Sequence, residues 1–446
     1  MSQHQQYSER VQELFPALRA DLESLVRIPS VSADAFDQVH LQRSAEAIAQ
    51  LLRAEGIEDV QILTAGESRP AIVARIPAPE GQPTVLLYAH HDVRPPGDPA
   101  TWETDPFEPT EKNGRLFGRG AADDKAGVIA HLGALRTLGS DLGIGVTLFI
   151  EGEEEIGSPY FVDFLEKYKE QLRADAIVVA DSANWKVGVP ALTTSLRGLV
   201  DCVVDVQVLT HAVHSGMFGG PVLDALTLMS RLISTLHDDS GDVAVAGLVH
   251  APDPTVDYDE ADLRADAGVL DSVQLAGTGP LTSRLWTKPA ISVIGIDAPT
   301  VALSSNTMTP KASAKISMRI APGQDPAAAY EALARHLEEN APFGAKVTVH
   351  KGELGKPFLA PENTPAMHAA RDAFAQAWGV EPVDIGIGGS IPFIADLLEV
   401  FPAAEILVTG VEDPDSRAHG ANESVHLEEL QKVVLAEALL LAGMKR

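Results

Sequence analysis

The sequence of 446 residues contains a single cysteine, Cys202, so no disulfide can form within one chain. Cys202 lies inside the apolar run 199–208, and this context predicts a buried thiol rather than a nucleophile. No apolar run is long enough to span a membrane, and residues 1–10 are polar where a signal peptide would be apolar. We therefore expect a cytoplasmic protein without a membrane partner.

Basic residues are scarce as well, with 34 Lys and Arg against 63 Asp and Glu and a net charge of -29. A surface of this sign repels phosphate groups, which argues against nucleic acid as a partner. Most of the excess acidity is expected to keep the surface soluble. It also means that a site for metal cations suits this sequence better than a site for a polyanion.

The length of the chain favours two domains rather than one. Up to about residue 194, short apolar runs alternate with segments of helical periodicity, and the same pattern resumes after residue 356. Fully apolar strands between helices indicate an α/β fold, with a mixed, mostly parallel sheet covered by helices on both faces. The predicted strands span 71–76, 84–89, 145–151, 176–180 and 405–409, and the predicted helices span 7–28, 41–55, 126–138, 159–172, 366–378 and a segment from Leu427.

The intervening region has a different pattern. Its elements follow the order β-α-β-β-α-β, which is typical of a small open-faced α+β sandwich that could fold by itself. We therefore expect a catalytic domain in two segments, 1–194 and 355–446, interrupted by an inserted domain at 195–354. In the inserted domain, strands are predicted at 199–209, 291–296, 311–320 and 346–351 and helices at 222–236 and 326–340, with 238–285 as a loop or insertion.

Acidic and imidazole side chains gather where the predicted strands end, which is where open α/β sheets place their sites. His90 and Asp92 directly follow the strand at 84–89 and point the same way on an extended backbone, whereas His91 points the opposite way. A histidine held by a nearby carboxylate is a common arrangement for a metal ligand. Asp123 lies in a glycine-rich turn before a helix, where a helix cap is the alternative interpretation.

The acidic run from Glu151 to Glu155 ends a buried strand, so its adjacent carboxylates would repel one another unless a cation lies among them. Glu154 and Glu155 could divide the roles, with one binding metal and the other transferring protons. Asp181 also ends an apolar run, where an unpaired carboxylate is costly. His419, taken alone, would be an ordinary loop histidine.

Together these motifs resemble the family of co-catalytic dinuclear zinc peptidases, which includes carnosinase-like dipeptidases, glutamate carboxypeptidase, aminoacylase and succinyl-diaminopimelate desuccinylase. The resemblance extends over essentially the whole chain and is closest to the bacterial dipeptidase branch. It implies hydrolysis of a peptide bond in dipeptides or similarly small peptides. It also implies a zinc-peptidase type of fold, an inserted lid domain that forms a homodimer, and two divalent cations per subunit, with zinc preferred over manganese or cobalt.

The same resemblance gives roles to the clustered residues. Asp92 resembles the carboxylate that orients a metal-binding histidine, and Glu154 resembles the general base of a metal-activated water. The peptide bond between Asp123 and Asp124 is expected to be cis, as it often is in the family. The implied metal ligands are His90 and Asp181 for one ion, Glu155 and His419 for the other, and Asp123 between the two ions.

Residues of the inserted domain and of a glycine loop complete the implied site. His214, in the motif 213–216, resembles the histidine that reaches the site of the partner subunit and stabilises the oxyanion. Arg319 resembles the residue that holds the substrate carboxylate, which suits the bidentate geometry of arginine. The other implied substrate-binding residues are Asn306, Gly389 and Ser390.

Two departures from the family pattern concern recognition of a free substrate amine. Ile387 stands where animal dipeptidases have a glutamate before the glycine pair, and the segment 181–185 lacks the tyrosine that often follows the metal-binding aspartate. An N-acyl-amino-acid deacylase or a carboxypeptidase with the same metal chemistry is therefore the alternative to a dipeptidase. A non-catalytic metal-binding protein is a more remote alternative, because such a protein would not need Glu154 beside a complete ligand set.

Overall fold

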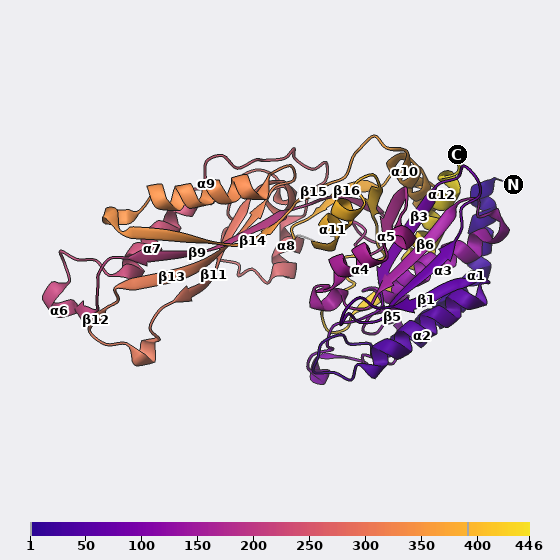
Figure 1. Cartoon of the computed structure of the whole chain (residues 1–446), viewed down its shortest axis with the longest axis horizontal. Coiled ribbons are helices and arrows are strands. Elements are labelled where there is room, and N and C mark those ends of the chain that lie inside the picture. The colour runs from indigo at the N-terminus through magenta and orange to yellow at the C-terminus, as the bar shows by residue number, and fades with distance from the viewer. Residues whose placement is uncertain (1, 390–391) are drawn as a thin grey trace. The chain divides into compact units, whose positions relative to one another are not determined.

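The computed structural model describes residues 2–389 and 392–446, so the predicted substrate-binding residue Ser390 lies outside the described residues. The chain divides into two compact units (Figure 1). The first comprises Met1–Thr194, Ala360–Ile385 and Asp396–Arg446, and the second comprises Ser195–Leu359 and Gly386–Ala395. Within the described ranges, no helix is long and apolar enough to cross a membrane. The predicted cytoplasmic location and the predicted absence of nucleic-acid and membrane partners stay predictions.

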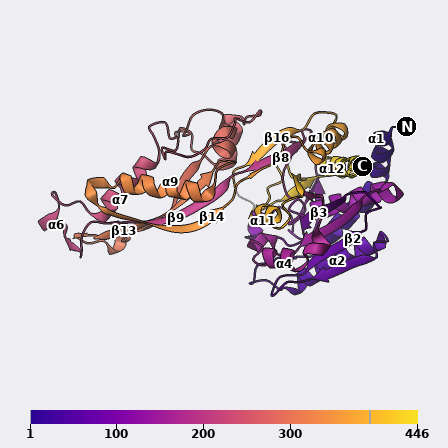
Figure 2. The same cartoon turned by 45° about the horizontal axis from the view of Figure 1, so that its top comes forward.

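A mixed sheet forms the centre of the first unit (Figure 2). Strands β6, β3, β7 and β17 run parallel, whereas β1, β2 and β8 run antiparallel to their neighbours. Because the four parallel strands point the same way, their carboxyl ends meet at one edge of the sheet. In spatial order the strands are β1 (Asp59–Leu63), β2 (Ala71–Ile76), β6 (Gly145–Glu151), β3 (Thr84–His90), β7 (Ala176–Val179), β17 (Glu405–Val408) and β8 (Ala191–Leu196), with β16 (Val383–Ile387) also paired to β8.

Helices cover both faces of this sheet, which confirms the predicted α/β fold. The connections from β3 to β6 and from β6 to β7 cross the sheet in opposite directions, so the right-handed crossover rule places α3 and α4 on opposite faces. The ring of Phe164 on α4 stacks on that of Phe149 on β6, with centroids 5.0 Å apart. The helices of this unit are α1 (Gln3–Val26), α2 (Val39–Ala54), α3 (Lys125–Leu138), α4 (Phe161–Lys167), α5 (Lys169–Leu172), α10 (Pro365–Trp378) and α12 (Leu427–Gly443), while α11 (Pro392–Val400) lies across the division between the units.

The structure differs from the sequence prediction in some local elements of the first unit. The helix predicted at 159–172 is divided into α4 and α5, because Tyr168 has a non-helical backbone conformation between them. Strand β1 is absent from the prediction because only Val60 is buried in it, so it contains no apolar run. Strand β8 places threonine and serine in buried positions, and polar residues of this kind conceal a strand from a search for apolar runs.

The second unit is an antiparallel sheet in the order β11-β13-β9-β14, with α7 and α9 packed on it. Residues of β9 alternate between the core, where Cys202 is fully buried as predicted, and the other face. On that face Asp201 lies 3.1 Å from Lys315, and Asp205 lies 2.8 Å from Lys311. The predicted β-α-β-β-α-β order is confirmed by β9 (Gly198–Gln207), α7 (Ala225–Ile233), β11 (Ala290–Asp297), β13 (Lys311–Ile320), α9 (Pro326–Glu339) and β14 (Lys346–Gly355).

The segment 238–285, predicted to be a loop or insertion, contains the helix α8 (Glu260–Ala267), which the prediction did not include. The side chain of Asp259 caps α8 by accepting a hydrogen bond from the backbone of Ala261 at 2.8 Å. The described residues of α8 are exposed or half-buried, so the helix has no buried apolar face and its sequence shows no helical periodicity. The predicted role of the second unit as a lid stays a prediction.

Candidate metal centre

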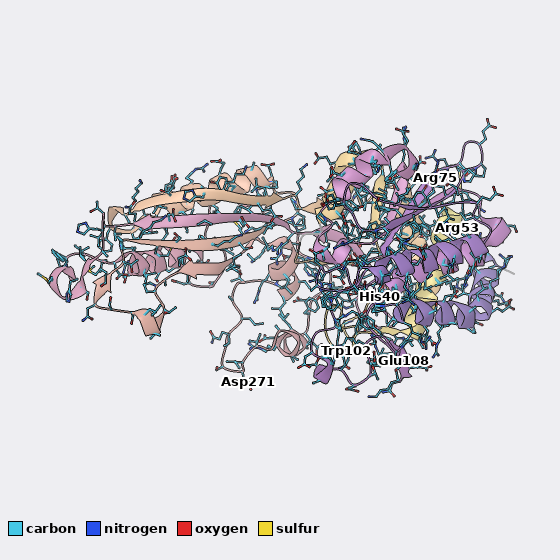
Figure 3. All side chains as sticks on the ribbon, turned by 60° about the horizontal axis from the view of Figure 1, so that its bottom comes forward. His40, Arg53, Arg75, Trp102, Glu108 and Asp271 are labelled. Carbon is cyan, nitrogen blue, oxygen red and sulfur yellow. The ribbon has the colours of Figure 1, made fainter. Side chains whose placement is uncertain are left out.

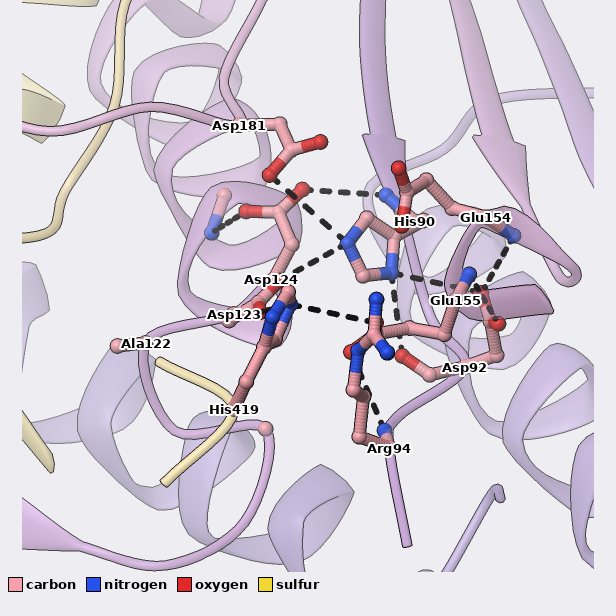
Figure 4. A network of polar contacts seen from close by, with 12 residues as sticks. His90, Asp92, Arg94, Ala122, Asp123, Asp124, Glu154, Glu155, Asp181 and His419 are labelled. Atoms are coloured by element: carbon pink, nitrogen blue, oxygen red, sulfur yellow. Dashed lines mark hydrogen bonds and ion pairs between the residues drawn. The ribbon is translucent and has the colours of Figure 1, made fainter. Parts of the chain in front are cut away.

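Side chains able to bind metal ions converge at the edge where the parallel strands of the first unit end (Figure 4). Each comes from the end of a strand or from the turn that follows it, which is why residues far apart in the sequence meet there. His90 ends β3, Glu155 follows β6, Asp181 follows β7, His419 follows β17, and Asp123 precedes α3.

Asp123 lies at the centre of this cluster. Its Oδ1 is 3.1 Å from His90 Nε2, and its Oδ2 is 3.0 Å from His419 Nε2. His90 Nε2 is also 3.9 Å from Asp181 Oδ1, and His419 Nε2 is 3.4 Å from Glu155 Oε2. The cluster therefore forms two groups that share Asp123, and within each group the potential ligand atoms lie within 4.8 Å of one another. Imidazole nitrogens and carboxylate oxygens in this arrangement fit divalent metal ions.

Asp92 lies on the side of His90 that faces away from Asp123. Its Oδ1 lies 3.4 Å from His90 Nδ1, so the opposite ring nitrogen of His90 faces Asp123. The same carboxylate accepts hydrogen bonds from the backbone N–H groups of Glu154, at 3.2 Å, and of Glu155, at 3.0 Å. One buried carboxylate thus orients a histidine of one group and the turn that carries a carboxylate of the other.

The helix cap, which was the alternative role predicted for Asp123, is formed by Asp124 instead. The peptide bond between them is cis, as expected. Asp124 caps α3, because its Oδ1 accepts a hydrogen bond from the backbone of Gly127 at 3.2 Å, and its Oδ2 accepts one from the backbone of His90 at 3.1 Å. A Cβ atom on Gly127 would lie 2.2 Å from that cap and 2.7 Å from Ala180 O, so the helix begins there only with glycine. The side chain of Asp123 is thereby left to the cluster.

The raised pKa values of Asp181 and Glu154 show that negative charge is in excess in the cluster. Burial raises the pKa of Asp181 to about 6, and the charges of Asp123 and Glu155 add to this effect against that of His90. Burial likewise raises the pKa of Glu154 to about 9, with contributions from Asp181 and Glu155. Hydrogen bonds to Asp123 and Glu155 raise the pKa of His419 to about 10. Glu154 and His419 thus retain protons at neutral pH, and divalent cations would displace these protons while neutralising the carboxylates.

Some residues of the candidate metal centre were not predicted from the sequence. Arg94 donates a hydrogen bond from its Nε to Glu155 Oε2 at 2.7 Å and another from its backbone to Glu155 Oε1 at 3.1 Å. Arg119 and Glu423 form an ion pair behind Asp123, and Glu412 lies beside the segment that follows Asp181. Arg119 and Glu423 belong to the same two motifs as Asp123 and His419, and their charge in buried surroundings is the signal that could have identified them.

The other predicted site residues belong to the second unit. His214 lies in β10 (Val213–His214), which pairs with β12 (Thr307–Met308), and the backbone oxygen of Asn306 accepts a hydrogen bond from Ser215 at 2.8 Å. Nδ1 of His214 accepts a hydrogen bond from Gly216 at 3.1 Å, so Nε2 carries the proton of the neutral ring. Gly389 is half-buried in the segment 386–395.

Arg319 lies on β13, opposite Leu199 of β9. Burial and, to a smaller extent, the charge of the nearby Arg319 lower the pKa of Arg197 to about 10. Arg197 also donates a hydrogen bond to the backbone oxygen of Gly388 at 2.9 Å. Two neighbouring guanidinium groups favour a negatively charged ligand such as a carboxylate.

Comparison with known proteins finds similar sequences and similar structures. The model of the peptidase family M20/M25/M40 matches residues 86–442. The chain is similar to a cysteinylglycine-S-conjugate dipeptidase of Corynebacterium striatum, with 36% identity over 409 residues that cover 89% of each chain. It is also similar to the structure of human carnosine dipeptidase 1, with 25% identity, a TM-score of 0.75 and coverage of 100% and 99%. The M20 metallo-carboxypeptidase Sso-CP2 from Sulfolobus solfataricus shares the fold, with 24% identity, a TM-score of 0.75 and coverage of 96% and 99%.

Replacing Asp123 is expected to weaken both groups at once, because each of its carboxylate oxygens faces one of them. We predict that Asp123→Ala loses most of the wild-type metal content after equilibration with zinc or manganese and removal of the free ions, as measured by atomic emission. Asp163→Ala, which removes an exposed carboxylate from α4, is the control and should keep the wild-type content. Equal metal content in the two variants would exclude Asp123 from metal binding.

Proposed function

Because this chain belongs to the peptidase family M20/M25/M40, we propose that it is a metal-dependent dipeptidase. The position of Asp123 carries this proposal, since its two oxygens lie 3.1 Å and 3.0 Å from the imidazoles of His90 and His419. A single carboxylate between two imidazoles suits a pair of divalent cations that share a bridging ligand. Similarity to a cysteinylglycine-S-conjugate dipeptidase supports the choice of small peptides as substrates.

We propose zinc as the metal and two ions per chain. Each group offers three protein ligands, and a zinc ion with three protein ligands keeps a fourth position for water or substrate. The first ion would be held by His90, Asp181 and Asp123, and the second by Glu155, His419 and Asp123. Manganese and cobalt accept the same ligand types and are the alternatives.

The proposed reaction is hydrolysis of the peptide bond, for which two bound cations would supply an activated water and polarise the scissile carbonyl. Glu154 is the proposed general base. It is half-buried, whereas the neighbouring Glu155 is buried and directed at His419. Glu154 accepts the proton of the attacking water and then donates it to the leaving amine. Burial raises the pKa of Glu154 in the absence of the cations, so their positive charge would be needed to release its proton and make it a base.

The first test is hydrolysis of a small panel after chelation and after addition of zinc or manganese. We expect metal-restored cleavage of Ala-Ala, Gly-Leu and Cys-Gly and no cleavage of N-acetyl-Ala. Glu154→Gln should keep the wild-type metal content and lower kcat by about 10²–10⁴-fold, because it retains shape and loses the base. Cleavage of N-acetyl-Ala alone would make the protein a deacylase, and full activity of Glu154→Gln would remove that residue from the mechanism.

Glu412 supports the choice of free dipeptides over acylated substrates. Its backbone is fixed beside Asp181, since its carbonyl accepts a hydrogen bond from Asn184 at 2.8 Å and its N–H donates to Ser182 O at 3.4 Å. Burial and the charges of Asp123 and Asp181 raise the pKa of its carboxyl group. That carboxyl group forms no ion pair with any residue in the described part of the chain. A carboxylate in this position suits the ammonium group of a free dipeptide, a role that Ile387 cannot take.

Replacement of Glu412 should therefore affect free and acylated ligands differently. We predict that Glu412→Gln raises the KM for Ala-Ala by about tenfold, equivalent to about 1.4 kcal/mol, because the ammonium loses its charged partner. The inhibition constant of N-acetyl-Ala-Ala, which has no ammonium group, should stay unchanged. Asp415→Asn, an exposed carboxylate of the same loop, serves as the control. A parallel change for both ligands would contradict the proposed contact.

The second unit supports a homodimer. Strand β11 lies at an edge of its sheet and exposes apolar side chains, with Val293 39%, Ile294 59% and Ile296 49% exposed. An exposed apolar edge strand favours pairing with a second copy of the chain. We propose that His214 acts in the site of the other subunit, where its Nε2–H donates to the oxyanion of the transition state. Arg319 would hold the substrate carboxylate, assisted by Asn306, Gly389 and Ser390.

A subunit-mixing experiment tests the proposed role of His214. His214→Ala and Glu154→Ala homodimers should each be inactive, and mixing them after reversible dissociation should restore up to about a quarter of the wild-type activity in sites with both residues intact. Exchange is monitored by a mass tag on one variant. Proven exchange without any recovered activity would count against action across the dimer.

A further inference from the structure

A buried ion pair behind the metal-binding cluster has no part in the mechanism described so far. Nη1 of Arg119 lies 2.7 Å from Glu423 Oε2, and the exposed fractions of the two side chains are 2% and 0%. The ring of Trp102, labelled in Figure 3, covers the guanidinium group at 5.4 Å. Removing two charges from water is costly, so a pair of this kind must be supported by further hydrogen bonds.

The carboxylate of Glu423 receives these hydrogen bonds from the loop that ends at Asp123. Its Oε1 accepts from the backbone N–H groups of Ala122, at 3.0 Å, and of Asp123, at 3.1 Å. Its Oε2 accepts from Gly120 at 3.1 Å, in addition to Arg119. Each carboxylate oxygen thus accepts two hydrogen bonds, and the loop surrounds the carboxylate. Because the N–H of Asp123 itself is held, the position of its side chain depends on Glu423.

Arg119 holds the turn that carries His419. Its Nη2 donates a hydrogen bond to the backbone oxygen of Gly420 at 3.0 Å. In this turn Arg417, His419 and Asn422 all have positive φ, at 55°, 64° and 60°, which non-glycine residues rarely adopt. The side chain of His419 is also 50% exposed, so its own packing does little to fix it. External contacts must therefore maintain the turn.

The two sets of contacts meet in one ion pair. Pairing of β5 (Arg115–Phe117) with β18 (Ser424–His426) brings the two segments together, and the backbone of Gly118 donates a hydrogen bond to Glu423 O at 3.0 Å. Arg119 and Glu423 consequently fix Asp123 and His419 relative to each other, although neither is a metal ligand. We propose that this pair is a positioning element that sets the affinity of the group Asp123, Glu155 and His419 for its cation.

This inference rests on the proposed function only in assuming that the cluster binds metal ions. The charge of Glu423 is essential to it, since the amide of a glutamine has a single acceptor oxygen and its NH₂ group would face N–H donors of the loop. Groups that orient metal ligands typically change metal affinity by about 10–100-fold when they are replaced. A purely structural role would instead lower the stability of the metal-free protein and leave metal affinity unchanged.

The test compares Glu423→Gln with Glu437→Gln in equilibrium dialysis against zinc buffers, with thermal unfolding of both metal-free proteins. Glu437 is a matched control, because it is buried on α12 and lies 2.7 Å from His131, outside the cluster. We expect both variants to unfold at lower temperature than the wild type. Only Glu423→Gln should lose one of two ions at a zinc concentration that saturates the wild type, with affinity lowered by about 10–100-fold.

Arg119→Lys is the milder variant and keeps the test open if Glu423→Gln does not fold. A lysine retains the charge but lacks the fork that reaches Glu423 and Gly420 together, so the same ion should be weakened to a smaller extent. Two ions bound with wild-type affinity by a folded Glu423→Gln or Arg119→Lys protein would overturn the inference. A wild-type protein that binds no ion would instead overturn the proposed function.

Discussion

Repulsion among carboxylates at one edge of a buried sheet is the constraint on which the first unit depends. Asp92, Asp123 and Glu155 are buried close together, beside the half-buried Asp181, where water screens their charges poorly. This repulsion is offset in part by imidazoles that lie between carboxylates and by backbone N–H groups that donate hydrogen bonds to Asp92 and Glu423. The cluster contains more carboxylates than imidazoles, so this compensation is incomplete, and divalent cations would complete the balance. Metal binding and the stability of this edge are therefore expected to depend on each other.

The central fold and the metal-binding cluster could be predicted because both follow from short-range patterns. Apolar runs locate β3, β6, β7 and β17, and the polar residues that follow three of them, His90, Glu155 and Asp181, are expected at the shared edge. Asp123 and His419 follow no such run directly, and the resemblance to the peptidase family added them to the set. Strands such as β1 and β8 fall outside this reasoning, because their burial depends on neighbours far away in the sequence.

Some supporting residues were not predicted, for a related reason. Arg119 and Glu423 are 304 residues apart, and only the pairing of β5 with β18 shows that they form an ion pair. Glu412 has no periodic context, and its proximity to the cluster arises from backbone contacts with the segment after Asp181. Residues that contact a ligand are therefore easier to identify from a sequence pattern than residues that position those ligand-binding residues. The roles proposed for His214 and Arg319 rest on resemblance and local geometry within the second unit.

The interruption of the first unit by the second has a consequence for how the protein is made. Strand β17 pairs with β7, and the turn bearing His419 follows β17, yet both are synthesised after the whole of the second unit. A nascent chain on the ribosome therefore has an open sheet edge at β7 and an incomplete ligand set for much of translation. Binding of the metal ions would therefore be a late step of biosynthesis. It would stabilise only chains in which β17 has already paired with β7.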